Sequence, residues 1–436
     1  MNRNRNTSEM RDGDVEVEYL RSICCVNNYS DKNRFVGVSI ENGKPKVCFP
    51  LGFRLSSTVS GIRKDIFLLF RVLERFSKRD EGISMTGHGE DAELPSFPFA
   101  AYRLIIKDFF RRGCYYADQV SAYKNNLNGV VSWSKTFRKN TPHVTQDGTL
   151  YYDKYVTKSL VRNENELITR IHKYCVYIAF TRVGWLFSRL QMPKFSCPAR
   201  KERMVDCLRQ KLSSSNISDN RLLFDAMLQV IENDSSSVVL KDFSYGTSYF
   251  EHIWERLIDY SFSNTDKREY FPRTEWFLPS LDGGQACTAL EPDTIVEYEN
   301  KIFIIDSKYY RYAMTGTKSH LPDSSSINKQ LIYGEQVSAR TDNAVYNAFL
   351  FPYDMGSNAV NGDSYIFCFG KASGSWKSKK KEYHTIVAVA MDTKSVMERF
   401  SKKEENIRLL CSHIEDYVAR NIVNGSDLEC SSPEEK

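Results

Sequence analysis

Two carboxylates and a lysine stand at the end of a strongly apolar segment of this 436-residue chain. Asp306 and Lys308 follow the apolar residues 302–305, and in an extended strand residues two apart project from the same face. Residues 290–298 predict a preceding strand, separated from the first by a short turn. Antiparallel pairing about that turn would bring Asp293 alongside the other two side chains.

These residue types suit metal-assisted hydrolysis of a phosphodiester. Carboxylate oxygens are ligands that Mg²⁺ prefers, and an ammonium group can hold a water or a phosphate oxygen. The Asp/Glu-x-Lys spacing alone is a weak signal, because it occurs four times, beginning at Glu299, Asp306, Asp392 and Glu434. We expect the other three copies to be surface charges. The competing interpretation of Asp306 and Lys308 is a simple ion pair at a strand end.

A helix with two acidic residues precedes these strands. Residues 248–260 have helical periodicity, and Glu251 and Glu255 are four apart, so both carboxylates lie on one face. Beyond the lysine, Tyr310 and Arg311 continue the strand outward, where we expect them to contact DNA.

Two basic segments fit either a nucleic-acid surface or a solvated surface. The first contains Trp376 and, without any acidic residue, five lysines: Lys371, Lys377, Lys379, Lys380 and Lys381. It could follow a phosphate backbone, or it could be a hairpin tip in solvent. The second segment carries Trp133, Lys135, Arg138 and Lys139, which could form a nucleic-acid or partner surface. Equally, the tryptophan could anchor a sheet while the basic residues are solvated.

Three successive regions are expected to position these residues. Residues 1–158 predict an α+β region with a β-sheet, including a hairpin at 34–53 about Asn42-Gly43 and a strand at 129–137. Residues 159–235 have the periodicity of several helices. A polar run from Asp234 then begins the last domain, residues 236–436.

Composition narrows the class of protein. The chain has 41% hydrophobic and 26% charged residues, which is typical of a globular protein. No apolar run is long enough to span a membrane, and the first residues lack the features of a secretory signal, so we expect a cytoplasmic protein. The eleven cysteines form no Cys-x-x-Cys pair, so we expect reduced thiols and no zinc site.

The order of these motifs resembles that of the PD-(D/E)XK nuclease superfamily: a glutamate-bearing helix, Pro292-Asp293, and an apolar run into Asp306-x-Lys308. Over most of its length the chain is similar to LlaJI-type restriction endonucleases, relatives of the McrC subunit of McrBC systems. That similarity also rests on residues 129–136, residues 142–151 and the Phe250-x-x-x-Trp254-Glu255 motif.

The resemblance implies a C-terminal α/β nuclease domain with a mixed central sheet flanked by helices. It implies that Asp293 and Asp306 bind Mg²⁺, or Mn²⁺ in its place, together with the backbone carbonyl of Ser307. Lys308 would be the catalytic lysine. Glu255 is our choice for the helix carboxylate, with Glu251 as its rival.

The helix at 327–334 is similar to the Gln/Tyr helix beside the active site of many of these enzymes. The resemblance therefore implies that Gln330 and Tyr333 lie near the scissile phosphate. No Gly-x-x-x-x-Gly-Lys-Ser/Thr loop is present, and family members work with a separately encoded McrB-like AAA+ NTPase.

We therefore expect a type II-like restriction endodeoxyribonuclease that cleaves double-stranded DNA with an AAA+ partner. The alternative is an adaptor that mainly binds and stimulates the AAA+ NTPase, with a degenerate or secondary nuclease fold.

Overall fold

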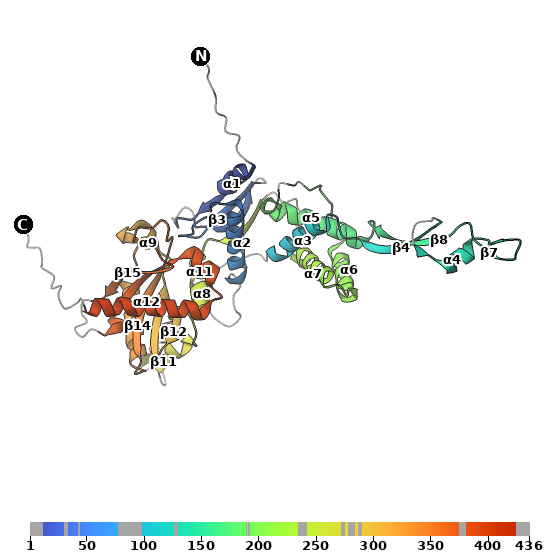
Figure 1. Cartoon of the computed structure of the whole chain (residues 1–436). Coiled ribbons are helices and arrows are strands. Elements are labelled where there is room, and N and C mark those ends of the chain that lie inside the picture. The colour runs from blue at the N-terminus through green and yellow to red at the C-terminus, as the bar shows by residue number, and fades with distance from the viewer. Residues whose placement is uncertain are drawn as a thin grey trace, which may run out of the picture. The chain divides into compact units, whose positions relative to one another are not determined.

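The computed structural model describes residues 12–29, 34–41, 44–76, 98–125, 130–188, 190, 192–233, 242–271, 275–277, 284–286, 290–374 and 381–423. The chain forms two compact units (Figure 1), one made of residues 1–95 and 241–436 and the other of residues 96–240.

This division differs from the three consecutive segments expected from the sequence. The N-terminal strands belong with the C-terminal domain because β2 (Val36–Glu41) pairs antiparallel with β9 (Asp242–Thr247). The intervening chain, with both the later N-terminal strands and the middle helices, forms the second unit. Local periodicity contains no information on such a long-range strand pairing.

The first unit contains a four-stranded sheet in the order β1-β3-β2-β9. Its middle strands, β2 and β3 (Lys44–Phe49), form the antiparallel hairpin that the sequence predicts, although the turn at Asn42-Gly43 lies outside the described residues. β1 (Cys24–Val26) follows α1 (Asp12–Ile23) and runs parallel to β3. The apolar helix α2 (Val59–Phe76) packs against β2 and α8 (Phe250–Phe262).

A five-stranded mixed sheet forms the centre of the same unit, in the order β12-β13-β14-β16-β15. The two strands predicted around the Asp/Lys motif, β12 and β13, are confirmed as an antiparallel pair. β14 pairs parallel with both β13 and β16, and β15 pairs antiparallel with β16. Their bounds are β12 (Thr294–Tyr298), β13 (Lys301–Ser307), β14 (Ala344–Tyr353), β15 (Ile366–Ser373) and β16 (Thr385–Asp392).

Two residues turn the chain between β12 and β13. Glu299 and Asn300 both have positive φ, 49° and 58°, and Tyr298 pairs with Lys301, which is the geometry of a tight two-residue hairpin. The loop fixes the register, so each residue of β12 has a defined partner on β13.

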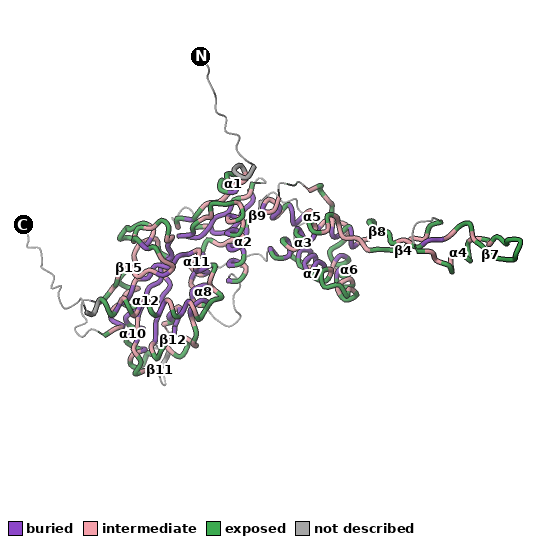
Figure 2. The backbone as a smooth tube through the Cα atoms, viewed as in Figure 1, coloured by how far each residue is buried: buried purple, intermediate pink, exposed green. Residues whose placement is uncertain are grey.

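Helices cover this sheet. α10 (Ser324–Ser338) connects the parallel strands β13 and β14 and packs its Tyr333 and Val337 against Ile302 and Ile304. α8 contacts β12 and α12 (Lys403–Val423), and α12 also contacts β15 and β16. The predicted helices at 248–260 and 327–334 are thus present. Figure 2 shows that buried residues concentrate in the strands and the inner faces of these helices.

The second unit combines a helical body with a β arm. The body contains α3 (Phe99–Arg112), α5 (Leu167–Val183), α6 (Lys201–Ser214) and α7 (Ser218–Asn233). Long strands β4 (Asp118–Asn125) and β8 (Val156–Asn163) pair antiparallel and extend away from the helices (Figure 1). The arm continues through β5 (Val130–Val131), α4 (Trp133–Lys139), β6 (His143–Val144) and β7 (Leu150–Tyr151).

The strand expected at residues 129–137 is wrong beyond its first residues. β5 ends at Val131, and α4 begins at Trp133. Trp133 and Phe137 are four apart, and their rings contact each other with centroids 5.7 Å apart, as one helical face allows. The buried Thr136 hydroxyl accepts a hydrogen bond from the Val156 amide, which fixes this turn of helix against the arm.

A second expectation is wrong at Asp392-x-Lys394, which we expected to be a surface charge pair. Asp392 is only 1% exposed and accepts a hydrogen bond from Ser395 N at the start of α11 (Thr393–Arg399). Lys394 Nζ lies 2.7 Å from Oδ1 of the buried Asp65. The ion pair between Lys394 and Asp65 therefore joins α2 to the end of the central sheet.

The remaining elements are short. They are η1 (Gly184–Leu186), η2 (Lys267–Tyr270), β10 (Glu275–Phe277), β11 (Gly284–Ala286), α9 (Tyr312–Thr315), η3 (Lys318–His320) and η4 (Glu382–His384). The described cysteines are free thiols. None of the helices in the described part of the chain has the length and apolar character needed to cross a membrane.

Candidate active site

The β12–β13 register brings the two aspartates of the motif together. Thr294 pairs with Ile305, so the next step along both strands places Asp293 opposite Asp306. The two carboxyl groups are close enough for Asp306 to raise the pKa of Asp293. Asp293 Oδ2 also accepts a hydrogen bond of 2.7 Å from the backbone N–H of Ser307.

Lys308 places a positive charge beside these carboxyl groups. Its Nζ lies 2.7 Å from Asp306 Oδ2, and both side chains are largely buried, with 17% and 8% of their areas exposed. Apart from this ion pair, Asp306 Oδ2 has no hydrogen-bond partner among the described residues. The Lys308 amide donates to Leu350 O on β14, which extends the parallel pairing one residue beyond β13.

Burial and neighbouring charges both change the pKa values of this site. Although part of Asp293 is accessible, the protein around its carboxyl group removes hydration and raises its pKa well above the ordinary value. The carboxylates of Asp306 and Glu255 raise it further. Burial lowers the pKa of Lys308, but Asp306 and Asp293 outweigh that effect and the net pKa is raised. Lys308 is therefore an ammonium ion at neutral pH.

The carboxylate oxygens of Asp293 and Asp306 are ligands of the kind that a divalent cation binds. Adjacent buried carboxylates repel each other, and a hard cation with oxygen ligands would relieve the repulsion that raises the pKa of Asp293. The protein ligands would be few, because no three Asp, Glu, His or Cys side chains in the described ranges converge tightly enough to hold a metal. Mg²⁺ commonly binds through one or two carboxylates and keeps several waters.

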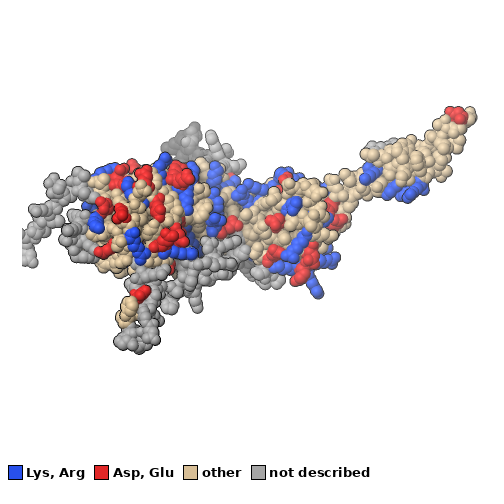
Figure 3. All heavy atoms as spheres, turned by 90° about the horizontal axis from the view of Figure 1, so that it is seen from below, with Lys and Arg blue, Asp and Glu red and all other residues tan. Residues whose placement is uncertain are grey.

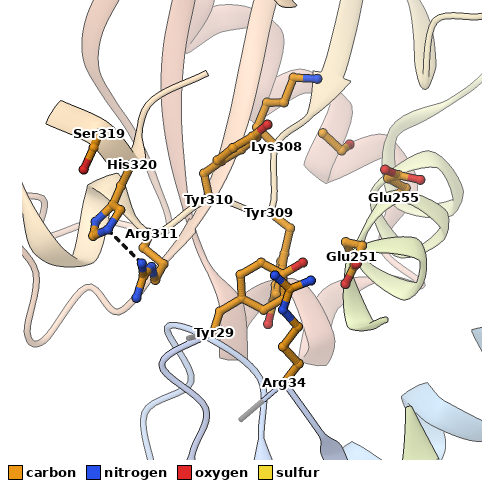
Figure 4. A pocket seen from close by; sticks show the side chains of 11 residues that line it. Tyr29, Arg34, Glu251, Glu255, Lys308, Tyr309, Tyr310, Arg311, Ser319 and His320 are labelled. Atoms are coloured by element: carbon orange, nitrogen blue, oxygen red, sulfur yellow. Dashed lines mark hydrogen bonds between the residues drawn. The ribbon is translucent and has the colours of Figure 1, made fainter. Parts of the chain in front are cut away.

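The two glutamates of α8 have different surroundings. Both line the pocket in front of Lys308 (Figure 4). Glu255 acts electrostatically on Asp293, and its Oε2 lies 3.7 Å from His252 Nδ1. Glu251 instead hydrogen-bonds Tyr29 and acts on the pKa of that residue. Glu255 is therefore the glutamate coupled to the aspartates.

The pocket has a volume of about 360 Å³ and is formed entirely within the first unit. Tyr310 and Arg311, which the sequence predicts as DNA contacts, both line it. Arg311 Nη2 lies 2.8 Å from His320 Nε2, and Thr315 Oγ1 lies 2.7 Å from His320 Nδ1. This chain of contacts holds the guanidinium of Arg311 at one side of the pocket (Figure 4).

Gln330 and Tyr333 support the active strand from α10. Gln330 is fully buried, and its Nε2 donates to Ile304 O at 2.8 Å and lies 3.3 Å from Asn347 Oδ1. Tyr333 donates its hydroxyl proton to Glu291 O at 2.8 Å. Neither residue is among those that line the pocket. In this structure both hold the strands that carry Asp293 and Asp306.

The lysine-rich segment is only partly described. Lys377, Lys379 and Lys380 lie outside the described residues. Lys381 is exposed, and its Nζ lies 5.7 Å from the centroid of the Tyr383 ring. The prediction that this segment binds DNA therefore stays a prediction.

Four pocket residues were missed from the sequence: Tyr29, Arg34, Ser319 and His320. Tyr29 and Arg34 come from the N-terminal sheet region, more than 200 positions before the aspartates in the printed sequence. No spacing or periodicity connects them to the motif. Only the packing of the first unit brings them there.

Comparison with known proteins identifies the family of this chain. The sequence profile of the LlaJI restriction endonuclease matches residues 35–394, a range that includes every element of the site except Tyr29 and Arg34. The chain belongs to the LlaJI restriction endonuclease family.

A curated protein is similar to this LlaJI family member over part of its length. A curated relative is the type II restriction enzyme BsuMI component YdjA of Bacillus subtilis (strain 168). The two are 27% identical over 264 residues, which is 57% of this chain and 56% of the relative. The chain thus spans about half the length of that relative.

Among solved structures, McrC bound to McrB AAA+ hexamers of Thermococcus gammatolerans, in a half-complex refined from a tetradecameric assembly, is similar at 16% identity. That match covers 86% of this chain and 83% of the other, with a TM-score of 0.35.

The electrostatics of this LlaJI family member predict a pH-dependent stability in EDTA. The pKa of Asp293 is raised in the folded chain, so the unfolded chain releases its proton first as the pH rises above about 4. Stability should then fall with rising pH, by about 1.4 kcal/mol for each unit by which the pKa is raised. Asp293→Asn should lack this loss, as measured by urea unfolding between pH 5 and 8.

Glu299→Gln is the matched control, because Glu299 is an exposed carboxylate in the turn of the same hairpin. Its pH dependence should follow that of the wild type. Equal pH dependence in wild type and Asp293→Asn would contradict the electrostatic account.

Proposed function

We propose that this chain is the nuclease subunit of a restriction system, a Mg²⁺-dependent endonuclease that cleaves phosphodiesters of double-stranded DNA. The observation that carries the proposal is the convergence of Asp293, Asp306 and Lys308 at the end of a buried strand. Membership of the LlaJI family supports the same conclusion. The helix–strand order around the site supports a PD-(D/E)XK domain.

Asp293 and Asp306 would hold Mg²⁺, or Mn²⁺ in its place, with the backbone carbonyl of Ser307 as a further ligand. A bound cation of this kind neutralises charge that develops on the phosphoryl oxygens and lowers the pKa of a water. The Ser307 N–H fixes the orientation of Asp293, and the antiparallel register fixes the distance between the carboxyl groups.

Lys308 would hold the attacking water or a phosphate oxygen. Its raised pKa keeps it protonated, so it acts as a hydrogen-bond donor and a positive charge and not as a general base. Asp306, 2.7 Å away, holds the ammonium in place. Glu255 would add a third carboxylate on the opposite wall of the pocket, where it can accept a proton from water.

Tyr310 and Arg311 are proposed to contact the DNA backbone beside this site. Both line the pocket, and Arg311 is oriented by His320. A guanidinium matches the geometry of a phosphate group with two parallel hydrogen bonds.

A separate AAA+ NTPase is proposed to work with the chain, and the β arm of the second unit is the surface we assign to it. The arm exposes large apolar side chains, which a protein partner would cover: Val130, Trp133, Phe137, Val144, Leu150 and Tyr151. Basic side chains lie on the same arm, and in the view of Figure 3 acidic side chains appear on it only at its far end.

The exposed arm also favours the second candidate function, an adaptor that stimulates the NTPase. The two functions differ at the nuclease site. Stimulating the NTPase does not require two buried carboxylates and a lysine, and burying these charges lowers the stability of the fold. Intact Asp293, Asp306 and Lys308 therefore favour the nuclease.

Replacing one carboxylate tests the nuclease directly. Asp306→Asn should reduce DNA cleavage in Mg²⁺ more than about 100-fold, since even residues that only orient metal ligands contribute 10- to 100-fold. Cleavage is measured with plasmid DNA, the full chain and its NTPase. Glu299→Gln, in an Asp/Glu-x-Lys copy of the same spacing, should cleave like the wild type. Undiminished cleavage by Asp306→Asn would overturn the assignment of Asp306 to the nuclease site.

The proposed role of the arm in binding the NTPase can be tested independently of the nuclease site. Trp133→Ala with Phe137→Ala should weaken binding of the NTPase at least about tenfold, as expected for exposed aromatic anchors of an interface. Binding is measured by sedimentation of the two purified proteins. Leu222→Ala, at an equally exposed apolar position on α7, is the control and should bind normally. Unchanged binding by the double variant would exclude this face of the arm as the surface that binds the NTPase.

A further inference from the structure

Two cysteines of the N-terminal sheet lie side by side. Cys25 on β1 and Cys48 on β3 are direct partners in the parallel pairing of these strands. Both are free thiols, and their sulfur atoms are hydrogen-bonded at 2.9 Å. Neighbouring strands lie about 4.8 Å apart, within the range of Cα separations, about 4.4–6.8 Å, that disulfides join. The pair can therefore be oxidised to a disulfide without a change of register.

The two thiols differ in their access to solvent. Cys25 is half-buried and lines a cavity of about 490 Å³, to which Tyr19 and Ser22 of α1 also contribute. Cys48 is 2% exposed and is not among the residues that line this cavity. A small molecule from solution would thus meet the sulfur of Cys25 before that of Cys48.

Two lysines give this cavity a positive charge. Lys44 and Lys46 are exposed and line it, and its described lining contains no aspartate or glutamate. Lys46 and Cys48 are two apart on β3, so their side chains lie on one face of the strand. A cavity with this charge favours an anionic molecule over a cationic one, because opposite charges attract at close range.

The hydrogen bond between the two thiols separates their proton affinities. The Cys48 thiol lowers the pKa of Cys25 to about 7; burial opposes this effect, and Lys46 adds to it. The same hydrogen bond, together with burial, raises the pKa of Cys48 above its ordinary value. About half of Cys25 is therefore thiolate at neutral pH, and the thiolate is the form of cysteine that attacks a disulfide.

The adjacent Cys24 does not meet the same requirements. It also lines the cavity, but successive residues of a strand point to opposite faces, so its side chain points away from Cys48. Burial raises the pKa of Cys24 to about 12. Cys24 is thus a protonated thiol without access to the resolving sulfur.

We propose that Cys25 is a site of thiol–disulfide exchange for anionic low-molecular-weight disulfides such as glutathione disulfide, with Cys48 as the resolving thiol. The Cys25 thiolate attacks one sulfur of glutathione disulfide, and one glutathione leaves as a thiolate that takes up a proton. Cys48 then loses its proton to water and attacks Cys25 Sγ, which releases the second glutathione and forms the Cys25–Cys48 bond. Two protein thiols are oxidised, and one glutathione disulfide is reduced to two thiols.

Mass spectrometry of the full chain tests both steps. After incubation with glutathione disulfide at pH 7, the wild type should lose two hydrogens and give a peptide in which Cys25 is bonded to Cys48. Cys48→Ser keeps a hydroxyl that can donate to Cys25 but has no thiol to resolve the adduct, so it should accumulate one glutathione on Cys25. The peptide map of the wild type requires no variant and decides the outcome if Cys48→Ser does not fold.

Cys197→Ser is the matched control, because Cys197 is an exposed free thiol in the second unit. Cys197→Ser and Cys24→Ser should both still form the Cys25–Cys48 bond. In the wild type, the free thiol of Cys25 should disappear at least about threefold faster than that of Cys197. The reason is that the thiolate fraction of Cys25 outweighs the lower reactivity that accompanies a lowered pKa.

The charge of the cavity is tested with Lys44→Gln and Lys46→Gln combined. This variant should lower the ratio of the rate with glutathione disulfide to the rate with cystamine, a cationic disulfide. The ratio cancels any change in the reactivity of the Cys25 thiol itself. The inference would be overturned by a wild type without the Cys25–Cys48 peptide, by a Cys25 that reacts no faster than Cys197, or by an unchanged ratio.

Discussion

Two carboxyl groups held opposite each other on neighbouring strands are the constraint on which the rest of the site depends. The tight turn at Glu299 and Asn300 sets the β12–β13 register, and that register alone places Asp293 against Asp306. Such an arrangement is costly, since both groups lose hydration and repel each other. Lys308 offsets part of the charge, but the loss of hydration and the neighbouring carboxylates still raise the pKa of Asp293.

The surrounding elements keep these groups from relaxing apart. Gln330 donates to the backbone of β13, and Tyr333 donates to the chain just before β12. On the other side, the Tyr309 hydroxyl accepts a hydrogen bond from the N-terminal loop at Leu51. A buried ion pair between Lys394 and Asp65 joins the same N-terminal region to the end of β16. The N-terminal sheet is therefore part of the framework of the site.

Much of the local structure was predictable from the sequence. The two strands around Asp306, the helix with Glu251 and Glu255 and the helix with Gln330 follow from apolar periodicity, and the register follows from a short turn. The α3 helix ends where Gly113 adopts a left-handed conformation, φ of 64°, as its glycine suggests. These features depend on residues close together in the chain.

What the sequence could not predict depends on distant residues. Trp133 and Phe137 satisfy both a strand and a helix pattern, and the helix that forms is held to the distant Val156 by a hydrogen bond to Thr136. Asp392-x-Lys394 has the spacing of surface charges, but its lysine meets Asp65, more than 300 positions away. The β2–β9 pairing and the pocket wall formed by Tyr29 and Arg34 are contacts of the same kind.

We propose that Asp293 and Asp306 together bind a divalent cation. Anomalous diffraction from a crystal soaked in Mn²⁺ tests it most directly. We expect one strong peak within about 2.0–2.3 Å of a carboxylate oxygen of each aspartate, a typical ligand distance for such ions. A fully occupied Mn²⁺ site elsewhere, with no peak between these two carboxylates at a concentration that supports cleavage, would contradict it.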